Sequence, residues 1–387
     1  MNKKSLAAAA ICAAVVIAAA PAKDPPPIAN YWMDVATTSG FGPGMSAAQM
    51  MMGGGGNSLG HTIDLRLASK TAAPAAPTAD HWIPGGLQMG PSLPLVTPAV
   101  AKQEPVQTGM PMNYKPKGRV LIYWGCGEHV SAGQPTVIDF AKLAPGKAPQ
   151  GMASIASMAK VVSGPHSAPG FGHWPNERDS RAVPAAGSLL GAHKVAGNYS
   201  PDISFSLASG QDFMPGLGFR EGGTSPSGAA RLNWQPVAQA TGYALMMFGS
   251  NEAGDTVMWS SAKTATMATM DYLAPSEVKR LINAGAVLPP SANECLLPAE
   301  VAAAVPAGMV MMIGYGPEVN FAQAPKAPKW TAKVRYKTTA SLMRGMAGMM
   351  GDAGRDESTP SEPQTQQQPK KKKKFGLGDL IGAVPRP

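Results

Sequence analysis

Clustered methionines are the residues of this sequence with the clearest potential for chemistry. One cluster lies in MSAAQMMMGGGG (45–56) and the other in LMRGMAGMM (342–350). Thioether sulfur is a soft ligand that selects Cu(I), so both segments could bind copper. The candidate ligands are Met45, Met50, Met51, Met52, Met343, Met346, Met349 and Met350. The alternative is an adaptable apolar contact surface, because methionine is flexible and polarizable.

Other potential metal ligands have less suitable spacing. They are Cys126, Glu128 and His129 in WGCGEH, and His166 and His173 in a later loop. Neither group supplies three or four ligands at the usual zinc-site spacings, which argues against zinc.

One motif resembles a catalytic signature only in its letters. Gly56-Asn-Ser58-Leu-Gly60 reads as G-x-S-x-G, but a nucleophile elbow needs a strand before it and a helix after it. Here glycines precede the motif and a strand is expected after it. We therefore expect no catalytic residues, and we predict that the protein is not an enzyme.

Exposed tryptophans would offer flat platforms for sugar rings. Trp82 and Trp174 lie in Pro/Gly-rich stretches beside His81 and His173, and they are the candidates for a ligand face. Trp234 is better explained as a core residue.

The two ends of the chain suggest export and a tail. Residues 1–22 combine a basic start, an apolar run over 6–20 and small residues at 20–22, the pattern of a cleaved signal peptide. The run is too short to span a membrane, so we expect a mature protein without a transmembrane segment, in the periplasm or on the outer cell surface. Residues 355–368 are rich in Ser, Pro, Gln and Glu and are expected to be disordered.

The end of the tail could contact a partner or an anionic surface. The residues that would do so are Lys370, Lys371, Lys372, Lys373, Lys374, Phe375, Leu377, Leu380 and Ile381.

Charge and cysteine content narrow the class of partner. The net charge is +9, but residues 23–369 carry 25 Lys and Arg against 23 Asp and Glu, which argues against nucleic-acid binding. We expect another envelope protein or a glycan as partner. Cys126 and Cys295 remain after cleavage; in an oxidising compartment they could be bridged, or they could be two separate buried thiols.

Hydrophobic patterning predicts a mainly β protein. Expected strands are 31–38, 62–68, 119–124, 136–143, 202–207, 231–234, 242–248, 255–260, 263–270, 309–315 and 332–339. Short helices are expected at 275–284 and 298–305, and long Gly/Pro loops at 70–80 and 146–181. We predict two β-sandwich-like domains, 23–220 and 221–341, followed by a Gly/Met-rich and disordered tail, 342–387.

Two segments, one in each half of the sequence, resemble each other. YWMDVATTS (31–39) and KVRYKTTAS (333–341) each contain a Thr-Thr pair and each lead into a Gly/Met-rich segment. The two strands could be paired in space, or one local solution could be used twice.

A resemblance to a known family is limited to the second half. LNWQPVAQATGY, from Leu232 to Tyr243, resembles the B strand, turn and C strand of fibronectin type III-like domains, and the resemblance extends over about 224–341. It implies that Trp234 and Tyr243 fill a core between two sheets, and that the domain binds or spaces rather than catalyses. The helix after Tyr272 would be an insertion.

The sequence thus favours an exported, non-enzymatic cell-envelope protein that acts as a binding, adhesion or scaffold module. Two alternatives stay open: a periplasmic Cu(I)-binding protein and a carbohydrate-binding module.

Overall fold

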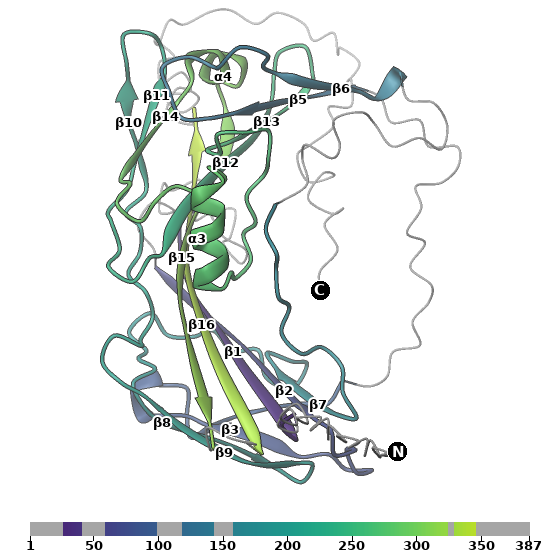
Figure 1. Ribbon diagram of the computed structural model, residues 1–387. Helices are drawn as coiled ribbons and strands as arrows, with labels where there is room; N and C mark the ends of the chain where they lie inside the picture. The colour runs from purple at the N-terminus through teal and green to yellow at the C-terminus, as the bar shows by residue number, and fades with distance from the viewer. Residues whose placement is uncertain (1–25, 41–58, 99–117, 143–157, 324–328, 346–387) are drawn as a thin grey trace, which may run out of the picture. The chain divides into compact units, whose positions relative to one another are not determined.

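The computed structural model describes residues 26–40, 59–98, 118–142, 158–323 and 329–345 (Figure 1). These residues form a mainly β structure with two α-helices. Neither helix in this part of the chain is long and apolar enough to cross a membrane. The signal-peptide pattern and the tail from 346 onward lie outside the described residues.

Three sheets contain the strands. The nine-stranded sheet has, in spatial order, β6 (Thr136–Asp139), β5 (Arg119–Trp124), β13 (Thr256–Ser260), β12 (Gly242–Ser250), β15 (Gly308–Ala322), β16 (Trp330–Arg344), β1 (Ala29–Gly40), β2 (Gly60–Ser69) and β7 (Gly170–Trp174). The three-stranded sheet has β10 (Arg220–Thr224), β11 (Ala230–Asn233) and β14 (Glu294–Leu297). The four-stranded sheet has β4 (Ser92–Pro94), β3 (Ala79–Trp82), β8 (Gly191–Gly197) and β9 (Ser200–Leu207). The helices are α3 (Pro275–Asn283) and α4 (Ala299–Ala304), with short 3-10 turns at Gly85–Leu87 and Phe140–Lys142.

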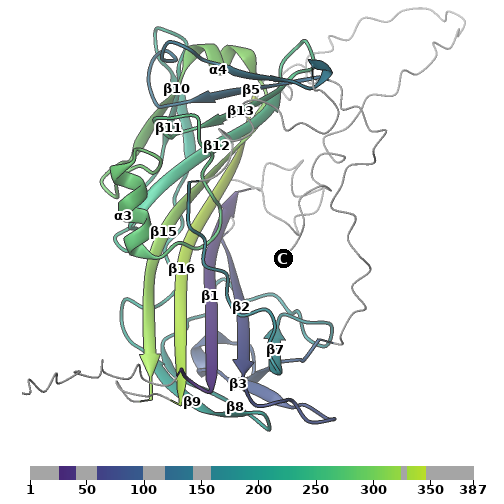
Figure 2. The ribbon, with the colours of Figure 1, turned by 45° about the vertical axis from the view of Figure 1, so that its right-hand side comes forward.

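Parallel pairing of β1 with β16 joins the two ends of the described chain. The register sets Thr37 opposite Thr338 and Thr38 opposite Thr339, and the two strands run side by side in Figures 1 and 2. The resemblance between these two segments therefore reflects pairing in space. Because the strands are parallel, the C-terminal ends of β1 and β16 lie side by side at the same end of the sheet.

This pairing also places both halves of the sequence in one sheet. Strands β1, β2, β5, β6 and β7 come from residues before 220, and β12, β13, β15 and β16 come from residues after it. The described residues fall in one compact unit. The predicted domain boundary at residue 220 therefore does not coincide with a boundary between sheets, because the nine-stranded sheet contains strands from both sides of it.

Alternation along each strand gives the nine-stranded sheet two different faces. Tyr31, Met33 and Val35 of β1 belong to an apolar core that also contains residues of the four-stranded sheet, such as Val195 and Ile203. The three-stranded sheet joins the same core. Both smaller sheets thus pack in the manner of a sandwich on one face of the large one.

A buried chain of hydrogen bonds crosses that apolar core. The Tyr31 hydroxyl is 2.8 Å from His81 Nδ1, His81 Nε2 is 2.9 Å from His193 Nδ1, and His193 Nε2 is 2.7 Å from the Leu189 carbonyl oxygen. A carbonyl only accepts, so His193 carries its proton on Nε2. It follows that His81 donates through Nε2 to His193 and accepts from Tyr31. Three polar side chains are satisfied inside the core, one from each of β1, β3 and β8.

The opposite face of the long strands carries buried charge. Arg335 of β16 donates to Asp34 of β1 through Nε at 2.6 Å and Nη2 at 2.5 Å, and both side chains are buried. Its guanidinium carbon lies 4.6 Å from the Trp32 ring centre and 4.8 Å from that of Tyr272, while Nη1 donates to the Val162 carbonyl. The bidentate geometry and the two aromatic rings offset the cost of removing this pair from water.

Helix α3 covers another part of the same face. Val278 and Leu281 pack with Ala244 and Ile313 in a second apolar cluster. The helix begins with Pro275, as the sequence predicted, because proline at the first position lacks only an N–H that has no helical partner.

Several segments differ from the sequence-based expectation. Strands β3, β4, β8, β10 and β14 were not expected, and β3 begins within the expected loop 70–80. Two further differences have a local cause. Residues 263–270 are not a strand: the Ser260 hydroxyl donates to the Thr266 carbonyl, and such local bonds compete with a sheet ladder. Within the expected loop 146–181, Gly170–Trp174 forms edge strand β7. A Cβ at Gly172 would lie 2.3 Å from the Tyr199 hydroxyl oxygen, so glycine is required for this close approach.

We expect the buried histidine pair to make stability fall in mild acid. Burial, together with neighbouring His193, lowers the pKa of His81 well below its usual value, and burial lowers the pKa of His193. The unfolded chain, with histidine pKa values of about 6.5, binds more protons below that pH than the folded chain. The free energy of unfolding should therefore fall by up to about 1.4 kcal/mol per pH unit for each histidine.

Denaturant unfolding at several pH values between 8 and 5.5 measures how steeply the free energy of unfolding changes with pH. The variant His81→Gln with His193→Gln should show a shallower slope, whereas Val195→Ala, a control from the same core, should lower stability with the slope intact. A wild-type stability that is flat over this range would contradict the expectation.

Candidate functional site

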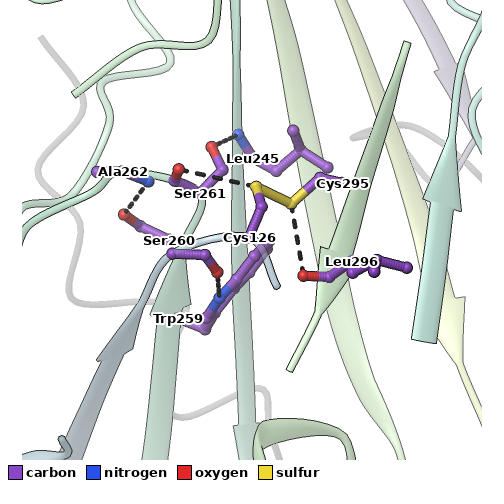
Figure 3. Close-up of a disulfide and its surroundings, with 9 residues drawn as sticks. Cys126, Leu245, Trp259, Ser260, Ser261, Ala262, Cys295 and Leu296 are labelled. Carbon is purple, nitrogen blue, oxygen red and sulfur yellow. Dashed lines mark hydrogen bonds between the residues drawn. A yellow bond between two sulfur atoms is a disulfide. The ribbon is translucent and has the colours of Figure 1, made fainter. Parts of the chain in front are cut away.

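A disulfide anchors the loop that follows β5. Cys126, two residues after β5, is bonded to Cys295 of β14 across a separation of 169 residues (Figure 3). The bond links the nine-stranded sheet to the three-stranded sheet. Beside it, the Trp259 indole donates to the Gly125 carbonyl at 2.9 Å. The backbone of residue 125 has a positive φ of 97°, a conformation that glycine adopts without strain.

Backbone hydrogen bonds continue this loop onto the start of α4. Gly127 N–H donates to the Leu296 carbonyl, and Ala299 N–H donates to the Glu128 carbonyl. At the other end of the loop the Gln134 side chain bonds both backbone groups of Trp124. The loop between Trp124 and Gln134 is therefore held at both ends, and it carries Glu128 and His129.

An open hollow lies against this loop. Its lining includes His129, Glu300 at the start of α4, Ser227, and Arg344 at the end of β16. His129 Nδ1 is 2.9 Å from Glu300 Oε1, and Glu300 Oε2 accepts from the Val130 N–H. The pKa of Glu300 is lowered by its own backbone N–H and by the bond with His129, so Glu300 orients this imidazole as a carboxylate.

The remaining carboxylate of the loop is bound by hydroxyl groups. Glu128 accepts from Ser225 at 2.5 Å and from Ser227, and these bonds lower the pKa of Glu128. Ser227 therefore directs its proton to Glu128 and not to His129. This arrangement suits recognition of a polar ligand, and it differs from the nucleophile-to-base hydrogen bond of a serine hydrolase.

The structure separates residues that the sequence grouped as potential metal ligands. Cys126 is in the disulfide, Glu128 faces two serines, and His129 pairs with Glu300. In the described ranges no group of three or more His, Cys, Asp or Glu side chains could hold a metal ion. The serines and Glu300 were not identified from sequence because they lie about 100 to 170 positions away, without a local motif.

The two tryptophans proposed as a ligand face have different positions. Trp82 on β3 is 42% exposed, as expected for such a face. Trp174 is buried in the main core at 2% exposure, which corrects the expectation for this residue. It lies opposite Leu65 in the pairing of β7 with β2, so its ring packs inward with that strand.

Of the methionine and tail candidates, one lies within the described residues. Met343 lies on β16 opposite Met309 of β15 and is half-buried. The others fall outside the described residues, namely Met45, Met50, Met51, Met52, Met346, Met349, Met350 and the tail residues from Lys370 to Ile381.

Comparison with known proteins gives no family for this chain. No protein-family model, no curated protein and no solved structure matches it. Within the stretch that resembles fibronectin type III-like domains, Trp234 and Tyr243 are buried with ring centres 5.6 Å apart. Trp234 directly follows β11 and Tyr243 lies on β12, and these two strands belong to different sheets. Both side chains lie in the main apolar core. The resemblance to fibronectin type III-like domains stays a prediction.

We expect the disulfide to stabilise the fold substantially. Replacing both cysteines, Cys126→Ala with Cys295→Ala, should lower the free energy of unfolding by about 2–4 kcal/mol, because the bond restricts a long loop in the unfolded chain. Guanidinium unfolding with and without reductant measures the loss. Reductant should destabilise the wild-type protein and leave the double variant unchanged; equal midpoints for oxidised and reduced wild type would contradict the expectation.

Proposed function

We propose that the protein is exported and acts, without catalysis, as a binding, adhesion or scaffold module of a cell envelope. The Cys126–Cys295 disulfide is the observation that carries the export half of this proposal. Such bonds form and persist mainly in oxidising compartments such as the periplasm and the cell exterior. The signal-peptide pattern of residues 1–22 supports the same location.

The surface of the described chain supports the binding half of the proposal. The hollow beside α4 has a His–Glu pair already oriented by hydrogen bonds, and Ser227 is engaged with Glu128. A second surface presents Trp82 from the outer face of the four-stranded sheet. The partner that fits these polar and aromatic surfaces is another envelope protein or a glycan, and the tail from Lys370 onward is a further candidate for contact with an anionic surface.

Fractionation of cells that express the full chain tests this proposal. We expect a mature chain that begins at Lys23 in the envelope or medium fraction, with Cys126 and Cys295 alkylated only after reduction. Intact mass measures both cleavage and alkylation. A chain retained in the cytoplasm with residues 1–22 attached and both thiols reactive would contradict the proposal.

A second candidate function is Cu(I) binding, and one observation favours it. Gly40 and Ser341 are opposite each other at the end of the paired strands. The Met-rich segment 45–52 follows β1 in sequence, and the segment 343–350 begins in the last residues of β16. Thioethers drawn from two such segments would provide the soft ligand set that Cu(I) prefers.

Replacement of sulfur by carbon tests the copper proposal. Changing Met343, Met346, Met349 and Met350 to Leu keeps size and apolarity, so Cu(I) affinity should fall by at least about tenfold if these residues are ligands. Titration against a competing Cu(I) chelator under reducing conditions measures the affinity. Met158→Leu, at a residue 42% exposed elsewhere, is the control. Equal affinity in the quadruple variant and the wild type would end this proposal.

A further inference from the structure

The outer face of the four-stranded sheet presents a single aromatic ring among polar side chains. One row across the sheet consists of Ser92, Trp82, Lys194 and Ser204, in the order given by strand pairing. Trp82 is 42% exposed, whereas the inward residues His81 and Val195 of the same strands are fully buried. The inward residues pack this sheet against the core. The exposed indole of Trp82 does not contribute to that packing.

The neighbours of Trp82 have the groups that bind hydroxyl-rich ligands. Asp80, on the same face of β3, accepts a hydrogen bond from Ser92 at 3.3 Å. Lys194 forms an ion pair with Asp202 at 2.9 Å, and Ser204 and Ser206 point outward from β9. Hydroxyl, carboxylate and ammonium groups therefore lie on the same face of the sheet as the indole.

We propose that this face binds a neutral pyranose glycan, with one sugar ring stacked on Trp82. The apolar C–H face of a pyranose fits a flat indole, and its equatorial hydroxyls reach outward to the polar neighbours of that ring. The proposal deepens the proposed binding function by assigning the partner class, and it depends on that function.

The composition of the face argues for a small neutral ring over other occupants. A stable protein interface usually buries about 800 Å² on each partner around several apolar anchors, and Trp82 is the one large apolar side chain among these outward residues. Asp80 and Asp202 outnumber Lys194, so the face carries net negative charge. An acidic polysaccharide would be repelled.

Binding of the full mature chain to defined glycans tests the proposal. The probes are soluble cello-oligosaccharides and chitin oligosaccharides as neutral glycans, and alginate as an acidic one, with affinity measured by calorimetry. Trp82→Ala should weaken binding to at least one neutral probe by about tenfold or more, and Trp82→Phe should retain most of it, because a smaller aromatic ring still stacks. Val137→Ala, at an exposed valine on β6, is the matched control and should bind as the wild type does.

Three results would overturn the proposal. They are no binding of either neutral probe by the wild-type chain, equal affinity in Trp82→Ala, or preference for alginate. Size-exclusion chromatography adds a check, because loss of self-association in Trp82→Ala without any glycan binding would identify the face as a protein contact. If the wild type binds neither probe and is still exported and oxidised, the glycan proposal fails while the proposed envelope function stands.

Discussion

The parallel pairing of β1 with β16 is the interaction on which the rest of the structure depends. Twelve register pairs, from Ala29 with Trp330 to Gly40 with Ser341, join segments about 300 residues apart. Among the strands that the structure describes, β2 and β7 are connected to the remainder of the large sheet only through β1. The four-stranded sheet in turn packs on this part of the core. Without the pairing, these strands would lack the surface that buries their apolar side chains.

Polar contacts on both faces specify the register of that pairing. On one face Asp34 and Arg335 are direct neighbours across the strands, with Trp32 and Tyr272 against the guanidinium. On the other face Tyr31 reaches His81 and, through it, His193. A slip of one residue would move Asp34 into the apolar core and Tyr31 out of it. Because an unpaired buried charge is costly, such a slipped arrangement would be strongly disfavoured.

The alternation of apolar and polar residues was enough to predict most strands and the helix α3. It could not predict strand partners, since pairing depends on residues hundreds of positions apart, and only the repeated Thr-Thr pair hinted at the neighbours of β1 and β16. Strand β7 was missed because Gly170 and Gly172 carry no hydrophobic pattern. Their role becomes visible only when Tyr199 packs against them.

The same limit applies to the candidate sites. His129 and Trp82 were recognised from residue type, but their partners Glu300 and Lys194 lie far away in sequence. For Cys126 and Cys295 the sequence left open whether they are bridged, and the structure joins them. Trp82 and His81 are adjacent, and which of them faces the core is decided by Tyr31 and His193 from other strands. Chemistry-bearing residues can thus be identified locally, whereas exposure and pairing follow from the tertiary fold.

The central claim is that residues from both halves of the chain form one sheet, and separate expression of 23–220 and 221–345 tests it most directly. Amide-resolved NMR spectra of each fragment, alone and mixed, provide the measurement. The account predicts that neither fragment alone has the dispersed spectrum of a folded sheet protein, because β16 is absent from one and β1 from the other. Two dispersed spectra that add up to the spectrum of the whole chain would contradict it and restore two independent domains.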